Sequence, residues 1–299
     1  MKFIHYNMSP KIKILGCRVN SSTSSHVLQK ISESLKSGTT CRIVTVNPEY
    51  ILEAQKDKQF QNIINNADLA VADGIGILWA AKFQSLAVSS NIIIRTVQCV
   101  LQYMWTGASL VFWPSYCRTV VSEKVSGAEL CKRIMNYESR IKNTNPTTHN
   151  SKFIIHNSKI FLLGGYDEVA EKIRKQFSRA NIVGTYEGTP ESESDTIKAC
   201  KIINNTKPDI LLVAYGNPAS RQEKWIEQNL PKLPSVKVAI GVGGSFNFLA
   251  RNIAQAPKWM QKIGLEWLWR LGRQPRRVRR IFRAVVVFSL MMLKNKIVS

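Results

Sequence analysis

The feature that most constrains this 299-residue chain is an alternation of short β-branched runs with stretches of helical periodicity. Such alternation produces a mainly parallel sheet with helices on both faces. The segment Asp167–Phe177 has Val169, Ile173 and Phe177 at four-residue spacing, which predicts a helix with one face on the sheet, and Ser24–Leu35 predicts another. The predicted strands are Ile12–Leu15, Arg42–Asn47, Leu69–Ala72, Ile160–Leu163, Ile182–Tyr186, Ile210–Ala214 and Val236–Ile240.

Changes in composition divide the chain into a core and two terminal segments. We expect an N-terminal tail at residues 1–10, a Rossmann-like α/β domain at 11–255, and a helical, basic appendage at 256–299. Within the domain, a polar linker at about 139–158 predicts a lobe boundary, and about 84–122 forms a helical insertion. Its apolar part, Ile92–Pro114, is interrupted by polar residues, so no confident transmembrane segment is predicted. The first ten residues lack the apolar core of a secretion signal, so export is not expected.

Positive charge is concentrated at the C-terminal end. The chain carries a formal charge of +22, and from Arg251 onward twelve basic residues face the single acid Glu266, a net of +11. Tryptophans and leucines alternate with these cations, as in interfacial helices that bind anionic lipid. We therefore expect an anionic membrane surface as a partner and a peripheral position on the inner, cytoplasmic face of the plasma membrane. The alternative is an aromatic helix packed on the core with a solvated basic face.

Several common site types are not indicated. The six cysteines form no C-x-x-C pair, and the four histidines have no metal-ligand spacing, so neither a zinc site nor a disulfide framework is predicted. There is no P-loop motif, and Gly164-Gly165 lacks the full G-x-G-x-x-G of dinucleotide-binding proteins. The sequence thus predicts a cytoplasmic protein with no metal and no cofactor.

An acid and two glycines follow one predicted strand. Asp73, Gly74 and Gly76 come directly after Leu69–Ala72. In doubly wound sheets, ligands bind at the carboxyl ends of the strands, and a carboxylate there can take a proton from an attacking hydroxyl. Spacing alone supports equally a helix-capping role for Asp73.

Other strand ends carry similar residues. Thr45 and Asn47 end the preceding predicted strand, although Asn47-Pro48 is also an ordinary turn opener, and the residues alone favour that structural role. The segment after Ala214 enters a helix whose N-terminus suits a diphosphate, but Pro218 can simply begin a solvated helix. The further candidate binding residues at these ends are Gly164, Gly216, Asn217, Gln222, Glu223 and Gly243.

Taken together, these segments resemble the WecG/TagA/CpsF family of glycosyltransferases, family 26. The resemblance runs from about Lys11 to Arg280, in seven ordered motifs. They are Thr45-Val46-Asn47, Asp73-Gly74-Ile75-Gly76, Val125-Ser126-Gly127-Ala128-Glu129-Leu130, Gly164-Gly165, Tyr215-Gly216-Asn217-Pro218 with Gln222-Glu223-Lys224-Trp225, Gly241-Val242-Gly243-Gly244-Ser245-Phe246, and Ala256-Pro257-Lys258-Trp259 through Gly264-Leu265-Glu266-Trp267-Leu268-Trp269-Arg270.

The resemblance implies an inverting, metal-independent transferase that moves N-acetylmannosamine or its uronic acid from a UDP-sugar donor. The implied acceptor is an N-acetylglucosamine on a polyprenyl diphosphate, used in cell-envelope polysaccharide or teichoic-acid-like polymer synthesis. Asp73 would be the base, with Thr45, Asn47 and Gln222 in the same pocket. Three arginines of the appendage would close over the site and hold the leaving diphosphate: Arg270, Arg277 and Arg280.

The chain departs from the family pattern in two places. Lys124 replaces the usual arginine before Val125-Ser126-Gly127, which keeps the charge but loses the planar fork. The second departure is the insertion, whose portion Ile92–Pro114 we interpret as a second membrane contact near the acceptor entrance. A buried helical hairpin or an oligomer contact is the alternative, which leaves a homo-oligomer open.

Two non-enzymatic functions also fit the charge. A basic nucleic-acid-binding module would explain the net charge, and a membrane scaffold would explain the tail. We expect a transferase and no nucleic-acid partner.

Overall fold

The computed structural model describes residues 10–136, 155, 157–216, 218, 220–250, 256–257, 260, 265–273 and 277–299. Eight strands form one sheet of order β1-β2-β4-β3-β8-β7-β5-β6, in which β1 and β2 pair antiparallel and the other described pairs are parallel. The strands are β1 (Lys11–Ile14), β2 (Cys17–Asn20), β3 (Cys41–Val46), β4 (Leu69–Ala72), β5 (Ile160–Gly164), β6 (Ile182–Tyr186), β7 (Ile210–Ala214) and β8 (Val238–Gly241).

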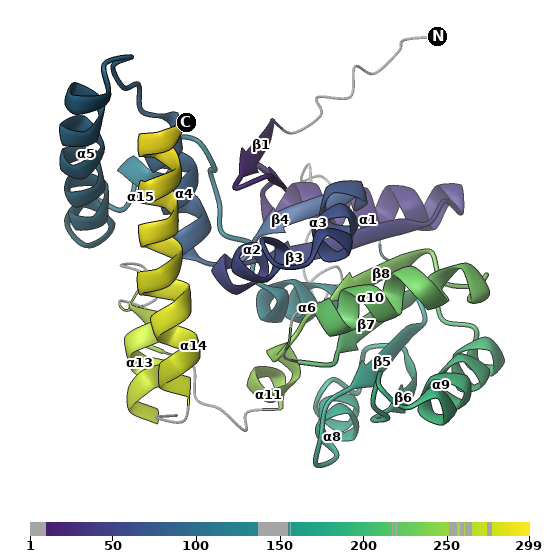
Figure 1. The fold of residues 1–299 in the computed structure, drawn as a ribbon. Helices are drawn as coiled ribbons and strands as arrows, with labels where there is room; N and C mark the ends of the chain where they lie inside the picture. The colour runs from purple at the N-terminus through teal and green to yellow at the C-terminus, as the bar shows by residue number, and fades with distance from the viewer. Residues whose placement is uncertain are drawn as a thin grey trace, which may run out of the picture.

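Helices cover both faces of this sheet (Figure 1). Successive strand residues point to opposite sides, so Ile43 packs in one apolar cluster and Val44 in another. The first face carries α1 (Ser24–Ser37), α6 (Gly127–Met135), α8 (Val169–Gln176) and α11 (Ser245–Leu249). The second carries α2 (Pro48–Ala54), α3 (Lys58–Asn66), α4 (Ile75–Ser85), α9 (Glu193–Thr206) and α10 (Ser220–Asn229). The predicted fold class, a mainly parallel α/β sheet flanked by helices, is confirmed.

A group of helices stands beside the sheet (Figure 1). It consists of α5 (Ile92–Phe112) from the insertion and α13 (Glu266–Arg273), α14 (Val278–Phe282) and α15 (Phe288–Val298) from the appendage. A π-helical segment, Arg283–Val287, joins α14 to α15 without a break. In α15, Phe288 and Met292 are buried in the same apolar cluster as Trp79 of α4. Within the described residues, no helix has both the length and the apolarity that crossing a bilayer requires.

The structure corrects the sequence prediction in one strand. The predicted Ile12–Leu15 ends at Ile14, and the chain turns back through Leu15 and Gly16 into β2, which we did not predict. Both turn residues have positive φ, 46° and 78°. Leucine rarely adopts this conformation. Because Leu15-Gly16 stands where Asn-Gly or Asp-Gly would predict such a turn, no local pattern indicated the hairpin. The other predicted strands are confirmed with small shifts at their ends. The predicted tail and the linker at 139–158 lie mostly outside the described residues.

Candidate active site

Asp73 lies at the carboxyl edge of the sheet, directly after β4. Its N–H donates to the carbonyl of Val46 on β3 at 2.7 Å, which ties this residue to the end of the neighbouring strand. The N-cap residue of α4 is Gly74, whose φ of 111° suits glycine alone. Asp73 therefore lies outside the N-cap position that was its alternative role. Its side chain is half-buried and lines a cavity.

The sequence left two roles open for Asn47, a structural one at a turn and a binding one, and its position in the structure is compatible with both. It is the N-cap of α2, where its side-chain oxygen accepts from the N–H of Tyr50 at 3.1 Å, and Pro48 occupies the first turn. The same residue lines the cavity beside Asp73. Capping fixes the direction of the side chain, since the oxygen must face the helix start. The amide group of Asn47 is thereby held at the edge of the cavity.

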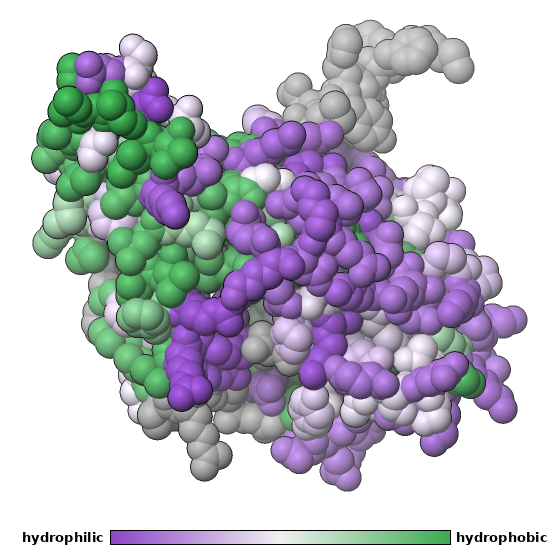
Figure 2. Space-filling model, viewed as in Figure 1, coloured by the Kyte–Doolittle hydropathy of each residue, from purple (hydrophilic) through white to green (hydrophobic). Residues whose placement is uncertain are grey.

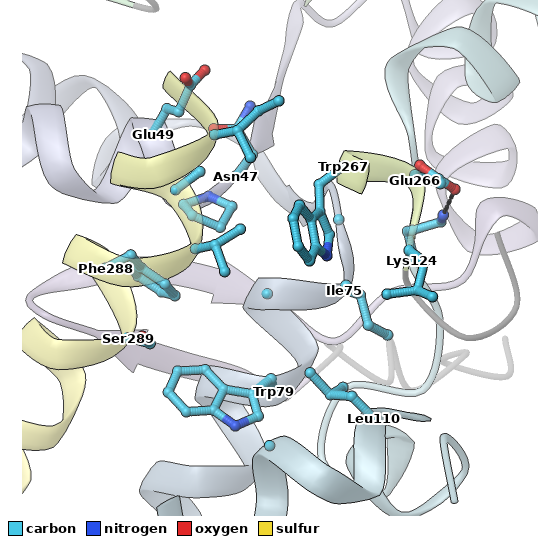
Figure 3. Close-up of a pocket in the computed structure, with 18 of the residues that line it drawn as sticks. Asn47, Glu49, Ile75, Trp79, Leu110, Lys124, Glu266, Trp267, Phe288 and Ser289 are labelled. Atoms are coloured by element: carbon cyan, nitrogen blue, oxygen red, sulfur yellow. Dashed lines mark hydrogen bonds and ion pairs between the residues drawn. The ribbon is translucent and has the colours of Figure 1, made fainter. Parts of the chain in front are cut away.

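The cavity has a volume of about 710 Å³ and lies between the sheet edge and the added helices. One side is formed by residues after β3 and β4 and by α4, and the other by α5, α13, α14 and α15. Figure 3 shows Trp267 of α13 between Asn47 and the Lys124–Glu266 pair, with Trp79 and Leu110 at the opposite end. The insertion and the appendage, remote in sequence, thus complete a single cavity with the strand ends.

Charged side chains at the polar end of the cavity form ion pairs. Arg280 binds Glu49 through two hydrogen bonds, Nε to Oε1 at 2.9 Å and Nη2 to Oε2 at 2.5 Å. This bidentate contact raises the pKa of Arg280 above its ordinary value. Lys124 pairs with Glu266 of α13. Arg277 lines the same cavity. Two cationic side chains of the appendage therefore share one space with Asp73.

Behind this edge lies a fully buried polar cluster of Tyr50, Gln222 and Glu223. Gln222 donates from Nε2 to the Tyr50 hydroxyl at 2.6 Å and accepts from the N–H of Gly243 at 3.0 Å. The Tyr50 hydroxyl donates to Glu223 at 3.2 Å. Burial raises the pKa of Glu223 to about 7, against the lowering effect of these hydrogen bonds. A Cβ on Gly241 would overlap Glu223, so the strand approaches this cluster closely because residue 241 is glycine. Through the Gly243 N–H, the cluster supports the loop that follows β8. None of its three residues is among those that line the cavity.

The structure brings together part of the predicted site. Asp73, Asn47, Gly74, Lys124, Arg277 and Arg280 line the cavity. Thr45 is buried, and its hydroxyl donates to the carbonyl of Gly241 at 2.8 Å, so it joins β3 to β8. Gly127 and Gly164 allow close packing, since a Cβ there would lie 2.8 Å from Ser245 and from Ala214 respectively.

Three predicted residues remain: Gly216, Asn217 and Arg270. Gly216 follows β7 with a φ of 71°, at the same edge of the sheet. Asn217 lies outside the described residues. Arg270 belongs to α13, but its side chain lies outside the described part.

Sequence reasoning missed Glu49, Tyr50 and Trp79 as parts of this region. Glu49 comes two residues after Asn47, in the first turn of α2, so its proximity to the strand end gave a usable signal. Tyr50 and Trp79 occupy ordinary buried helix positions, and no local pattern separates them from core residues. Their roles follow from contacts with residues more than 20 positions away, Gln222 and Thr106.

A ligand-sized cavity at the carboxyl edge of a parallel sheet, lined by a carboxylate and by basic side chains, is typical of α/β enzymes. The glycosyl transferase WecG/TagA/CpsF family profile matches residues 12–105 and 95–299. The chain therefore belongs to this family and is a glycosyltransferase, as the resemblance of its motifs indicated. The non-enzymatic alternatives are set aside.

Two curated relatives extend this comparison. The chain is 25% identical over 280 residues, 93% of its length and 89% of the relative's, to an N-acetylglucosaminyldiphosphoundecaprenol N-acetyl-beta-D-mannosaminyltransferase of Bacillus subtilis (strain 168). It is 27% identical over 239 residues, 80% of its length and 74% of the relative's, to a protein of the same name from Bacillus spizizenii.

Proposed function

We propose that this glycosyltransferase moves N-acetylmannosamine, or its uronic acid, from a UDP-sugar to an N-acetylglucosamine on a polyprenyl diphosphate. The names of the two relatives support the transferred sugar and the acceptor. The product belongs to the synthesis of a cell-surface polysaccharide or a teichoic-acid-like polymer. We further propose that transfer inverts the anomeric configuration and needs no metal ion.

The observation that carries this proposal is the shared cavity of Asp73, Arg277 and Arg280. In a single displacement, the oxygen of the acceptor hydroxyl attacks the anomeric carbon of the donor sugar while the Asp73 carboxylate takes the proton of that hydroxyl. The bond between that carbon and the diphosphate oxygen breaks, and UDP leaves from the opposite side. The configuration at the anomeric carbon is therefore inverted.

The departing diphosphate gains negative charge, which the basic side chains are suited to stabilise. Arginine binds phosphate oxygens with two parallel hydrogen bonds, and this is strongest where charge develops. We propose that Arg270, Arg277 and Arg280 hold the diphosphate, with Lys124 adding a positive charge without the fork. Arg280 would exchange the Glu49 carboxylate for phosphate oxygens, since both bind the same guanidinium edge.

The remaining site residues support or approach the sugar. We propose that Asn47 hydrogen-bonds the donor sugar directly, since its capping contact orients it beside Asp73. The buried Gln222 would act through the Gly243 N–H that it binds, and Glu223 and Thr45 would stabilise the same strand ends.

Apolar side chains on one face of the molecule support membrane association. Figure 2 shows a continuous hydrophobic surface over α5 and α15, in contrast to the hydrophilic surface over the sheet. Its members include Ile93, Leu101 and Phe112 on α5, and Phe282 and Leu290 on the C-terminal helices. Exposed apolar patches of this kind mark interaction surfaces. We propose that this face rests on the cytoplasmic leaflet, with the arginines of the appendage attracted to anionic lipid.

The test is a transfer assay with a panel of UDP-sugars and polyprenyl-diphosphate N-acetylglucosamine, with and without a chelator. We expect consumption of UDP-N-acetylmannosamine or its uronic acid, an inverted product by NMR, and no loss with chelator. Transfer of neither sugar would contradict the donor, and loss of activity with chelator, restored by a divalent cation, would contradict metal independence. Binding to anionic vesicles that survives deletion of residues 84–122 would contradict the membrane role of the insertion.

A further inference from the structure

The two ends of the cavity differ in chemistry. Its polar end contains Asp73, Arg277 and Arg280, whereas the end between α5 and α15 is walled by Tyr103, Leu110 and other apolar residues. We call the latter the apolar limb, defined by Trp79, Tyr103, Gly107, Leu110, Ala284 and Phe288. In Figure 3, Trp79 and Leu110 lie at the end opposite Asn47 and Glu266, and Phe288 lies to the side on α15.

Polar atoms on the rings of the apolar limb already have partners within the protein. The Trp79 indole N–H donates to the Thr106 hydroxyl at 3.0 Å. The Tyr103 hydroxyl is hydrogen-bonded to Ser289 at 2.9 Å. A sugar or nucleotide would need polar partners here, because a buried hydroxyl without one is costly. A hydrocarbon needs none, and it gains by leaving water. The limb therefore suits an apolar ligand.

The apolar limb opens toward the hydrophobic surface over α5 and α15. Met104, Val111 and Val285 line the cavity and are nevertheless 65%, 43% and 38% exposed. The apolar surface continues outward from them over α5 and the C-terminal helices (Figure 2). A chain that is longer than the limb can leave between these side chains and continue along an apolar surface.

The two walls of the limb are held in place by contacts at its far end. Lys296 of α15 donates to Gln102 of α5 at 2.6 Å and also to the carbonyl of Phe83 on α4. Arg95 donates to the carbonyl of Ile297 at 3.5 Å. With the Tyr103–Ser289 bond, these contacts span α5 from its second turn to its middle. These contacts between its walls fix the shape of the limb, so binding requires little reorganisation.

We propose that the apolar limb binds the first isoprene units of the acceptor's polyprenyl chain. This rests on the proposed function, since it requires a lipid-linked acceptor. The diphosphate of that acceptor would lie at the boundary between the limb and the basic end, with its sugar toward Asp73. The limb then acts as a recognition site that selects acceptors by their lipid and positions the hydroxyl for attack.

Gly107 offers a way to fill the limb without disturbing the fold. It lies on α5 and lines the cavity, and a Cβ built on it meets no atom within 4 Å. In Gly107→Leu, the new side chain enters the limb, and leucine favours helix more than glycine does. Gly272→Leu is the matched control, because Gly272 is also helical, also has open space around its Cβ, and is not among the cavity-lining residues.

The experiment compares two acceptors in detergent micelles, so that binding to a bilayer does not contribute. One is N-acetylglucosaminyl diphosphate on a polyprenyl chain. The other is the same sugar diphosphate with a methyl group instead of the polyprenyl chain. We expect Gly107→Leu to raise KM for the polyprenyl acceptor at least tenfold, with KM for the methyl acceptor and the donor unchanged. Gly272→Leu should match the native chain with both acceptors.

A photoreactive polyprenyl diphosphate without a sugar gives a second readout, independent of catalysis. With the reactive group in the first isoprene unit, crosslinks should fall on peptides of α5 and α14–α15 and decrease in Gly107→Leu. An unchanged KM for the polyprenyl acceptor, an equal rise for both acceptors, or crosslinks elsewhere would overturn the inference. If the native chain glycosylates neither acceptor while crosslinks still fall on α5 and α15, the proposed function fails and lipid binding by the limb stands.

Discussion

The two walls of the cavity are held in place by different kinds of contact. On the sheet side, the Asp73 N–H donates to the main chain at the end of β3, and the Asn47 side chain accepts from the main chain at the start of α2. On the helical side, the appendage is held by side-chain contacts: Tyr103–Ser289 joins α15 to α5, and Arg280–Glu49 joins α14 to α2. A main-chain position in a buried sheet is rigid, whereas a partly exposed ion pair contributes little and can exchange partners. The sheet wall is therefore suited to fixed chemistry, and the helical wall to binding charge and lipid that enter and leave.

The largest effect should come from removing the carboxylate on the sheet wall. Asp73→Asn keeps the size of the side chain but cannot accept the acceptor proton. We expect kcat to fall about 1,000-fold, within the usual range for a general base. The thermal midpoint and the dissociation constant for UDP should stay close to native. Steady-state kinetics, thermal unfolding and calorimetry measure the three quantities.

Asp68→Asn is the matched control for this change. Asp68 precedes β4 at the opposite end of the same strand, is exposed, and accepts from the N–H of Arg42 at 2.7 Å, a bond that asparagine can keep. Its activity should remain near native. Turnover of Asp73→Asn within tenfold of native would remove Asp73 from the role of base.

The difference between the walls also explains what the sequence revealed. Strand ends are local signals, so the β-branched run before Asp73 predicted both the strand and the edge at which this residue lies. The helical wall depends on contacts between segments about 190 residues apart, such as Tyr103 and Ser289, which no local pattern encodes. The apolar limb was missed for this reason, whereas Glu49 was missed although it lies in the first turn of α2, beside the strand end. Thr45 and Gln222 were assigned to the pocket by resemblance. Their side-chain contacts, Thr45 to the Gly241 carbonyl and Gln222 to the Gly243 N–H and the Tyr50 hydroxyl, are with residues far away in the sequence and follow only from the fold.

Behind the sheet wall, the buried Glu223 should make the stability of the fold depend on pH. Its pKa is about 7 in the fold against an ordinary 4.5. Between these values the folded chain binds more protons than the unfolded chain, so stability is lost as pH rises from about 4.5 to 7 and stays low above it. The loss should be about 3 kcal/mol at pH 8.

Glu223→Gln should remove this component, because glutamine does not ionise. Urea unfolding of both chains at pH 5 and pH 8 measures it. The native chain should lose about 2.5 kcal/mol more than the variant over this interval. Parallel pH profiles of the two chains would show that Glu223 titrates normally in the fold.

On the helical wall, Arg280→Ala tests whether the appendage stabilises the leaving group. We expect kcat to fall about 100-fold, as for loss of one donor to developing charge. Arg280→Lys should recover part of the activity, because a lysine restores the charge without the bidentate geometry. Arg279→Ala is the control, since Arg279 is exposed and does not line the cavity. Equal losses in Arg279→Ala and Arg280→Ala would point to a general effect of charge.

The smallest effect, and the finest test of exchange at the helical wall, should come from Glu49→Gln. The Glu49 carboxylate binds Arg280 through both oxygens, so a diphosphate that uses this guanidinium must displace it. Glutamine removes the competing negative charge, and UDP should bind about fivefold more tightly, or about 1 kcal/mol. Calorimetry at low and high salt should show the gain shrinking as salt screens the charges. Glu129→Gln, which alters a surface pair with Arg133, should leave UDP binding unchanged. Weaker binding in Glu49→Gln would instead mean that Glu49 orients Arg280 for the phosphate, and that the helical wall is as preorganised as the sheet wall.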